Sequence, residues 1–136
     1  MAATFSKEER AAMRAAAAEA KAAKAGADMT AACDAAIAEM AGKDRELATI
    51  VHRIVLTNTA LTPRTWYGMP AYSNADGKTV VFFQSASKFR VRYATLGFQP
   101  AAQLDDGNYW PTSFALIDVS PADEEQLVEL IRQAAG

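Results

Sequence analysis

The sequence has few cysteine and histidine residues, which form the disulfide bonds and metal sites that stabilise many small domains. It holds a single cysteine, Cys33, and a single histidine, His52, in 136 residues. A disulfide framework needs paired cysteines, and a zinc finger needs several cysteine or histidine ligands. Both classes of protein are therefore excluded. On folding, a chain of this length can bury roughly two-thirds of the surface that it exposes when unfolded, so it needs no disulfide or metal ion for stability. This predicts an ordinary globular domain.

The sequence also lacks a strong charge of either sign and any long apolar run. It has 14 Lys and Arg against 16 Asp and Glu, a net charge of -2, so no long-range field would concentrate a phosphate backbone. We therefore expect no nucleic-acid partner. No stretch reaches the roughly 18 apolar residues that cross a bilayer, and charged residues follow Ser6 where a signal peptide would be apolar. We expect a cytoplasmic protein without a membrane partner.

The first part of the chain is rich in alanine and other helix formers. Ser6 and Glu9 have the spacing of a capping box, and residues 7–24 favour a helix that ends near Gly26. Its large apolar side chains are few, so the helix offers little to bury. We interpret residues 1–26 as a helical extension, with an interaction helix as the alternative.

Two further helices are predicted by apolar residues at helical spacing. The first is expected to be capped by Asp28, to run to about Met40 and to be ended by Gly42. The second is expected to be capped by Asp44. Cys33 falls within the apolar stripe of the first helix, which predicts a buried, unreactive thiol, reduced in the cytoplasm. His52 points away from the apolar face of the second, which predicts an exposed histidine.

From about residue 62 the spacing changes to that of strands. Residues 73–77 are dense in turn formers and predict a hairpin, and Ser120 followed by Pro121 predicts the start of a last helix. Helices, then a meander, then a helix is the pattern of a two-layer α+β domain, with a mostly antiparallel sheet of about four to six strands. We expect residues 27–136 to form this single domain. Strands are predicted over residues 79–83, 89–95 and 113–117. In the aromatic segment 65–72, Gly68-Met69-Pro70 is interpreted as a turn between two strands, with the alternative that it holds Tyr67 and Tyr72 at the mouth of a cleft.

The segment TWYGMPAY at residues 65–72 resembles the signature of the YdhG-like family, a widespread bacterial domain of unknown function. Residues 80–83, 87–89 and 112–114 and the acidic start of the last helix match the same order, so the resemblance covers about residues 28–135. Most relatives have no assigned activity, and a branch is described as a frataxin-like intracellular iron chaperone. The resemblance therefore implies a carrier of iron rather than an enzyme, and it supplies no iron-ligand pattern that can be transferred by position.

Iron that is carried loosely prefers hard oxygen ligands from carboxylates. The candidate ligands are Asp105 and Asp106 in the loop before the last strand, with Asp76 and the acidic residues 123–125 as further carboxylates. Each also has a structural interpretation: Asp76 precedes a glycine in a turn, and an acidic first turn suits a helix dipole.

The second candidate site combines aromatic and basic side chains. Alternation would place three cations on one face of a strand, and aromatic side chains on that face would complete a cleft for a small anionic or planar ligand. The alternative is that the aromatic residues are core and the cations solvated. The candidate residues are Trp66, Tyr67, Met69, Tyr72, Lys88, Arg90, Arg92 and Trp110.

Catalytic patterns are weak in this chain. His52 alone on a helix does not predict a Ser-His-Asp or Cys-His arrangement, and there is no glycine-rich phosphate loop. The prediction is a non-enzymatic cytoplasmic binding protein, with an iron-chaperone-like role as its most specific form. The alternatives are a small-ligand domain that uses the cleft and a protein-interaction module that uses the first helix. The partner would be a small molecule or an iron ion, and a homodimer is left open.

Overall fold

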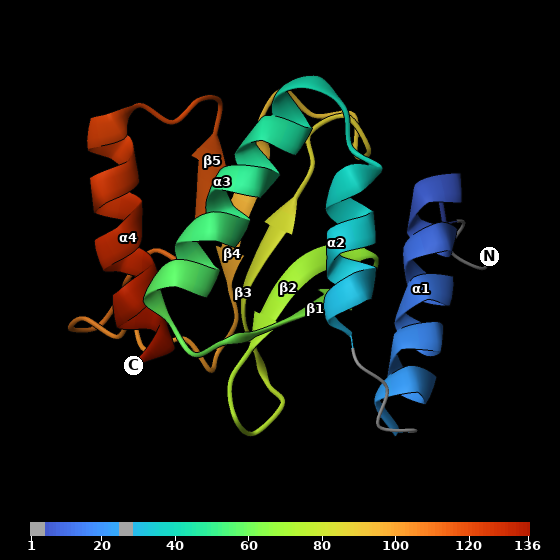
Figure 1. The fold of residues 1–136 in the computed structure, drawn as a ribbon, viewed down its shortest axis with the longest axis horizontal. Coiled ribbons are helices and arrows are strands. Elements are labelled where there is room, and N and C mark those ends of the chain that lie inside the picture. Colours follow the sequence, from blue (N-terminus) through green and yellow to red (C-terminus); the bar gives the residue numbers. More distant parts are fainter. Residues whose placement is uncertain (1–4, 25–28) are drawn as a thin grey trace.

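The computed structural model describes residues 5–24 and 29–136, and these form four helices and five strands (Figure 1). The helices are α1 (Lys7–Lys24), α2 (Thr30–Ala38), α3 (Gly42–Asn58) and α4 (Pro121–Ala135). The strands are β1 (Thr62–Trp66), β2 (Met69–Ser73), β3 (Thr79–Gln84), β4 (Ala94–Phe98) and β5 (Ser113–Leu116). The predicted α+β fold is confirmed.

The strands form one antiparallel meander in the order β1-β2-β3-β4-β5. Trp66 pairs with Met69 across the β1–β2 turn, and Phe82 pairs with Ala71 on one side and with Gly97 on the other. Paired residues share a face of a sheet, and neighbours along a strand point to opposite faces. All five of these residues therefore lie on the same face, and the residues next to them along each strand lie on the other.

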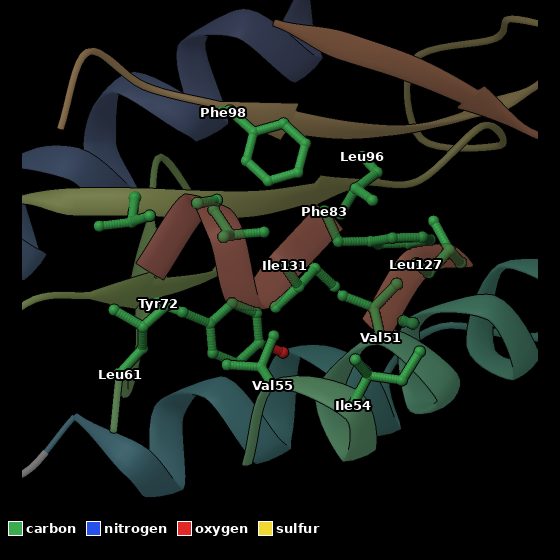
Figure 2. Close-up of a cluster of buried hydrophobic side chains, with 14 of the residues drawn as sticks. Val51, Ile54, Val55, Leu61, Tyr72, Phe83, Leu96, Phe98, Leu127 and Ile131 are labelled. Carbon is green, nitrogen blue, oxygen red and sulfur yellow. The ribbon is translucent and has the colours of Figure 1, made fainter. Parts of the chain in front are cut away.

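Helices α2, α3 and α4 cover only one face of the sheet (Figure 1). Side chains from β2, β3 and β4 meet those of α3 and α4 there and are removed from water (Figure 2), which is the main source of stability for a domain of this kind. We call this the helix face and the opposite one the open face. Labelled members of the buried cluster include Val51, Tyr72, Phe83, Leu96 and Ile131.

Two predicted helix starts are confirmed by their hydrogen bonds. The N–H of Glu9 donates to Ser6 Oγ at 3.0 Å, and the N–H of Ser6 donates to Glu9 Oε1 at 3.3 Å. At α4 the N–H of Asp123 donates to Ser120 Oγ at 3.1 Å, the Asp123 carboxylate accepts from the Ser120 N–H, and Pro121 is the first helical residue. Both are capping boxes, which satisfy amides that the helix itself leaves free.

The helix ends near residue 40 differ from the prediction. Asp28, the expected cap of α2, lies outside the described residues, as does Gly26. Gly42 was expected to close α2, but α2 ends at Ala38 and Gly42 begins α3 at a φ of 57°. Asp44 was expected to cap α3 and does not, because its carboxylate is directed instead at a distant loop.

Helix α1 lies beside α2, next to the turn between β1 and β2 (Figure 1). It belongs to the predicted extension over residues 1–26, and its largest apolar side chain, Met13, is 47% exposed. A helix of alanines buries little apolar area, so its position depends on the polar contacts described below.

Candidate functional site

An aromatic pair lies on the open face of the sheet. The ring centroids of Trp66 and Phe82 are 5.3 Å apart, and Tyr67 meets Trp66 edge-on at 4.9 Å. The Phe82 ring lies over Gly97, where any Cβ would overlap it. Glycine at this position therefore lets Phe82 lie flat on the sheet, and the pair forms a half-buried aromatic shelf.

A shallow pocket of about 370 Å³ opens beside this shelf. Arg64, which shares the strand face of Trp66, and Lys78, from the β2–β3 turn, bring two positive charges to it. Within the described part of the chain, neither cation has an ion-pair partner. An anion in the pocket could therefore pair with them without breaking an existing ion pair. Its other lining residues are Gly77, Thr79, Gln99, Pro100 and Ala101.

One buried hydroxyl near this pocket is left unsatisfied. Ser73 Oγ is buried and has no hydrogen-bond partner among the described residues. A β-bulge between Tyr72 and Ser73 shifts the register so that Ser73 pairs with Thr79, which lines the pocket. An unpaired buried hydroxyl costs stability, but Ser73 itself does not line the pocket.

The aromatic residues predicted to line one cleft are divided between different parts of the fold. Trp66 and Met69 share the open face, but Tyr72 points to the helix face and is completely buried. Tyr67 occupies the β1–β2 turn and is 43% exposed, as the turn interpretation of the Gly68-Met69-Pro70 motif suggests. The predicted cleft is therefore not formed as a unit, because the strand alternation sends Tyr72 to the core.

The three predicted cations do not alternate along a strand, and the strand predicted over residues 89–95 begins only at Ala94. Lys88, Arg90 and Arg92 belong to a loop in which the N–H of Arg90 donates to the carbonyl of Ser87, with Arg90 at a φ of 54°. This closed turn removes the residues from the sheet. All three are exposed.

Trp110 does not line the pocket of Trp66 and packs against the hydrophobic core. It lines a pocket of about 410 Å³ with Asp105, while Asp106 is exposed in the same loop. Among the described residues, no group of three or more His, Cys, Asp or Glu side chains is arranged to hold a metal ion. The assignment of Asp105 and Asp106 as iron ligands stays a prediction.

A polar network that the sequence did not predict joins the lone cysteine and the lone histidine. Tyr72 Oη lies 2.9 Å from His52 Nδ1, and His52 Nε2 lies 3.3 Å from Asp34 Oδ1. The carboxylate places the ring proton on Nε2, so Nδ1 accepts from the Tyr72 hydroxyl. Cys33 Sγ lies 3.9 Å from His52 Nδ1 and shares a hydrogen bond with Tyr72. The prediction of an exposed His52 without a partner is wrong.

This network suits a structural role better than metal binding or nucleophilic chemistry. Cys33 and Asp34 approach opposite nitrogens of His52, so the three side chains cannot converge on one ion. Burial raises the pKa of the Cys33 thiol to about 11, and the neutral thiol is a poor nucleophile. The prediction that Cys33 is buried is confirmed.

Cys33 is expected to resist thiol reagents in the folded protein. With an aromatic disulfide reagent at pH 8, we expect labelling to be slower than in the denatured chain by about a hundredfold or more, because the thiol is both buried and protonated. The measurement is the release of the coloured thiol, with and without denaturant. Equal rates in the two samples would contradict the buried position.

Two buried carboxylates, one on α1 and one on α3, each accept hydrogen bonds from a pair of backbone N–H groups in a distant loop or turn. Asp44 accepts from the N–H groups of Ala86 and Ser87 at 2.9 and 3.0 Å. Glu19 on α1 accepts from the N–H groups of Tyr67 and Gly68 at 2.8 and 2.9 Å. These contacts span 42 to 49 residues of sequence, so no local pattern predicts them.

Comparison of the chain with models of known protein families, with curated proteins and with solved structures finds no match. The resemblance to the YdhG-like family therefore stays a prediction. In the part of the chain that is described, no helix has the length and apolar character to cross a bilayer. The function is accordingly inferred from the residues of the open face.

Proposed function

We propose that this protein binds a small planar anion on the open face of its sheet and holds it without transforming it. The observation that carries the proposal is the Trp66–Phe82 shelf beside Arg64 and Lys78, two cations without ion-pair partners among the described residues. A flat ring gains contact area on such a shelf, and a carboxylate or phosphate on that ring gains charge-assisted hydrogen bonds.

The size of the pocket narrows the class of ligand. A volume of about 370 Å³ lies near the lower end of known small-molecule sites. A single or fused aromatic ring with one acidic group fits this space, and a large cofactor does not. Because the pocket is shallow and much of its rim is polar, we expect an affinity in the range of about 10 µM to 1 mM.

The proposal predicts a saturable change in Trp66 fluorescence. A Trp110→Phe variant makes Trp66 the only tryptophan, and it is titrated with benzoate, naphthoate and phenyl phosphate. Removing a cation by Arg64→Gln or Lys78→Gln is expected to weaken binding by about tenfold, because each loses a charge-assisted hydrogen bond. Arg45→Gln, an exposed cation on α3, is the matched control and should leave the affinity unchanged.

Equal weakening by Arg45→Gln would show that only the overall charge matters. If the fluorescence of Trp66 does not change with any ligand, in a variant whose amide spectrum shows the native fold, binding at the shelf is refuted. A signal that persists with Trp66→Phe in a chain that keeps Trp110 would place the ligand in the other pocket, near Asp105.

The iron-carrier role, in the cytoplasm, is the more specific form that the YdhG-like resemblance implies, and it rests on that resemblance. Ferrous iron added to the same protein without oxygen provides its test. If Asp105 and Asp106 hold iron, their amide signals should shift and broaden before those of the open face. Signals that stay unchanged at millimolar iron would leave the planar anion as the better proposal.

A further inference from the structure

The turn between β1 and β2 has the geometry of an oxyanion-binding turn. Tyr67 and Gly68 have φ angles of 52° and 79°, and their N–H groups donate to the two oxygens of one carboxylate, that of Glu19. Consecutive N–H groups that converge in this way form a concave site of partial positive charge, and such sites bind phosphates and carboxylates in proteins. The turn therefore already holds an anion, which the chain itself provides.

The anion comes from a helix that has few other attachments. Glu19 is 7% exposed. Among the described residues, the other ion pair or hydrogen bond from α1 to the sheet and its loops is an exposed one, 3.4 Å long, between Glu8 and Arg90. Glu8 and Glu19 are eleven residues apart, which is about three helical turns, so they lie on one side of α1. Between them, that side carries alanines such as Ala11 and Ala15, which contribute little on burial. The docking of α1 therefore depends mainly on Glu19.

A cation and an open cavity lie beside the same turn. The cation is Lys88, whose Nζ lies over the ring of Phe89 at 5.9 Å from its centroid. Lys88 Nζ is 3.2 Å from the point where a Cβ on Gly68 would stand, and Lys88 has no ion-pair partner among the described residues. Both residues line a cavity of about 380 Å³, together with Ser85, Ser87 and two acidic residues, Glu39 and Asp44. Both oxygens of Asp44 already accept backbone N–H groups, those of Ala86 and Ser87. No residue of α1 lines this cavity, so there is room for the body of a ligand whose acidic group takes the position of the Glu19 carboxylate.

We propose that the β1–β2 turn is a second binding site, for a carboxylate or phosphate group, and that Glu19 is its internal competitor. A ligand binds when α1 lifts away from the turn. Its oxyanion accepts from the N–H groups of Tyr67 and Gly68 and pairs with Lys88, and its remaining atoms occupy the cavity. The site shares no side chain with the Trp66–Phe82 shelf. The test of this site is therefore independent of the test of the function proposed above.

The test removes the internal anion from the full chain and supplies an external one. Glu19→Ala is titrated with inorganic phosphate and, separately, with acetate, while sodium chloride controls for ionic strength. The amide signals of Tyr67 and Gly68 are followed by NMR. We expect saturable shifts at these two amides with phosphate, acetate or both, and whichever binds more tightly gives the ligand class. Lys88→Gln in the Glu19→Ala chain should weaken that binding by about tenfold, because it removes the charged partner.

Wild type and Glu8→Ala are the matched controls. Glu8→Ala also removes a carboxylate from α1, but it leaves Glu19 on the turn, so neither protein should show these shifts at the same concentrations. Should Glu19→Ala give no native spectrum, Glu19→Gln replaces it, since the neutral amide competes less well than a carboxylate. The proposal is overturned if the folded Glu19 variant shows no saturable shift with either anion, or if Glu8→Ala responds equally.

Discussion

Replacing Tyr72 by alanine is expected to lower the free energy of unfolding by about 4 kcal/mol, within the range seen when a large aromatic residue is removed from a core. Tyr72 is completely buried and is the largest of the fully buried side chains. It packs on the helix face among residues of α3 and β3 (Figure 2). Alanine would leave a cavity there that a close-packed core fills only in part. Chemical denaturation followed by circular dichroism provides the measurement.

Tyr72→Phe separates the ring from the hydroxyl. The phenylalanine ring keeps most of the volume, but His52 Nδ1 and the Cys33 thiol lose their hydrogen-bond partner. We expect a loss of about 1–2 kcal/mol, the cost of leaving buried polar atoms unpaired. If the two variants lose the same amount, the network rather than the packing of the ring stabilises this part of the core. If Tyr72→Phe costs nothing, the network has no role in stability.

Wild type and Tyr72→Phe are expected to differ in their response to alkali. Burial raises the pKa of Tyr72 above the ordinary tyrosine value, so the folded state holds the phenolic proton more tightly than the unfolded state does. The resulting stability is complete below the unfolded pKa of 10.0 and is lost as the pH rises above it. Tyr72→Phe should abolish this part of the alkaline loss. The part due to Cys33, between pH 9.0 and about 11, should persist.

Features with a local signal were predictable from the sequence. The capping box at Ser120 and the hairpin at residues 73–77 depend on residues within a few positions of one another. In that hairpin, Asn74 Oδ1 accepts from the N–H groups of Asp76 and Lys78, and Gly77 takes a φ of 77°. Turn formers and caps encode such geometry directly. The order of helices and strands follows from these signals together with the apolar periodicity.

The candidate sites depend on contacts between distant residues, and these were not predictable. Cys33 and His52 are 19 residues apart on different helices, and they meet only because both helices pack on Tyr72. Helical spacing predicted that His52 points away from the apolar face of its helix, and it could not show that Asp34 and Tyr72 lie beside the ring. The pattern around Arg90 suggested alternation, yet its left-handed φ closes a turn instead. A residue pattern reports a local preference, whereas tertiary contacts decide between the preferences.

Replacing Asp44 by alanine is expected to lower the free energy of unfolding by about 3 kcal/mol. Asp44 lies at the start of α3, is 7% exposed and accepts from the N–H groups of Ala86 and Ser87. Alanine would leave both amides without their charged acceptor, and an unsatisfied buried donor costs about 1–3 kcal/mol. We expect the loop that begins at residue 85 to lose its protection from hydrogen exchange before the rest of the sheet. The measurement combines denaturant unfolding with exchange at the two amides.

The sharper comparison is between Asp44→Asn and the wild type at low pH. Both the substitution and protonation remove the charge of the Asp44 side chain and keep its shape. Burial acts to raise the pKa of Asp44, but the hydrogen bonds from Ala86 and Ser87 outweigh it, so the pKa lies below its ordinary value of 3.8. The stabilisation is therefore present above pH 3.8 and is lost as the pH falls through the folded-state pKa. The stability difference between wild type and Asp44→Asn should be constant near neutrality and shrink in this acidic window. Asp118→Ala removes an exposed carboxylate whose pKa is also lowered, first by the hydrogen bond from the Val119 N–H, and should change stability little. A difference between wild type and Asp44→Asn that stays constant down to pH 2 would show that the amides do not depend on the charge of Asp44.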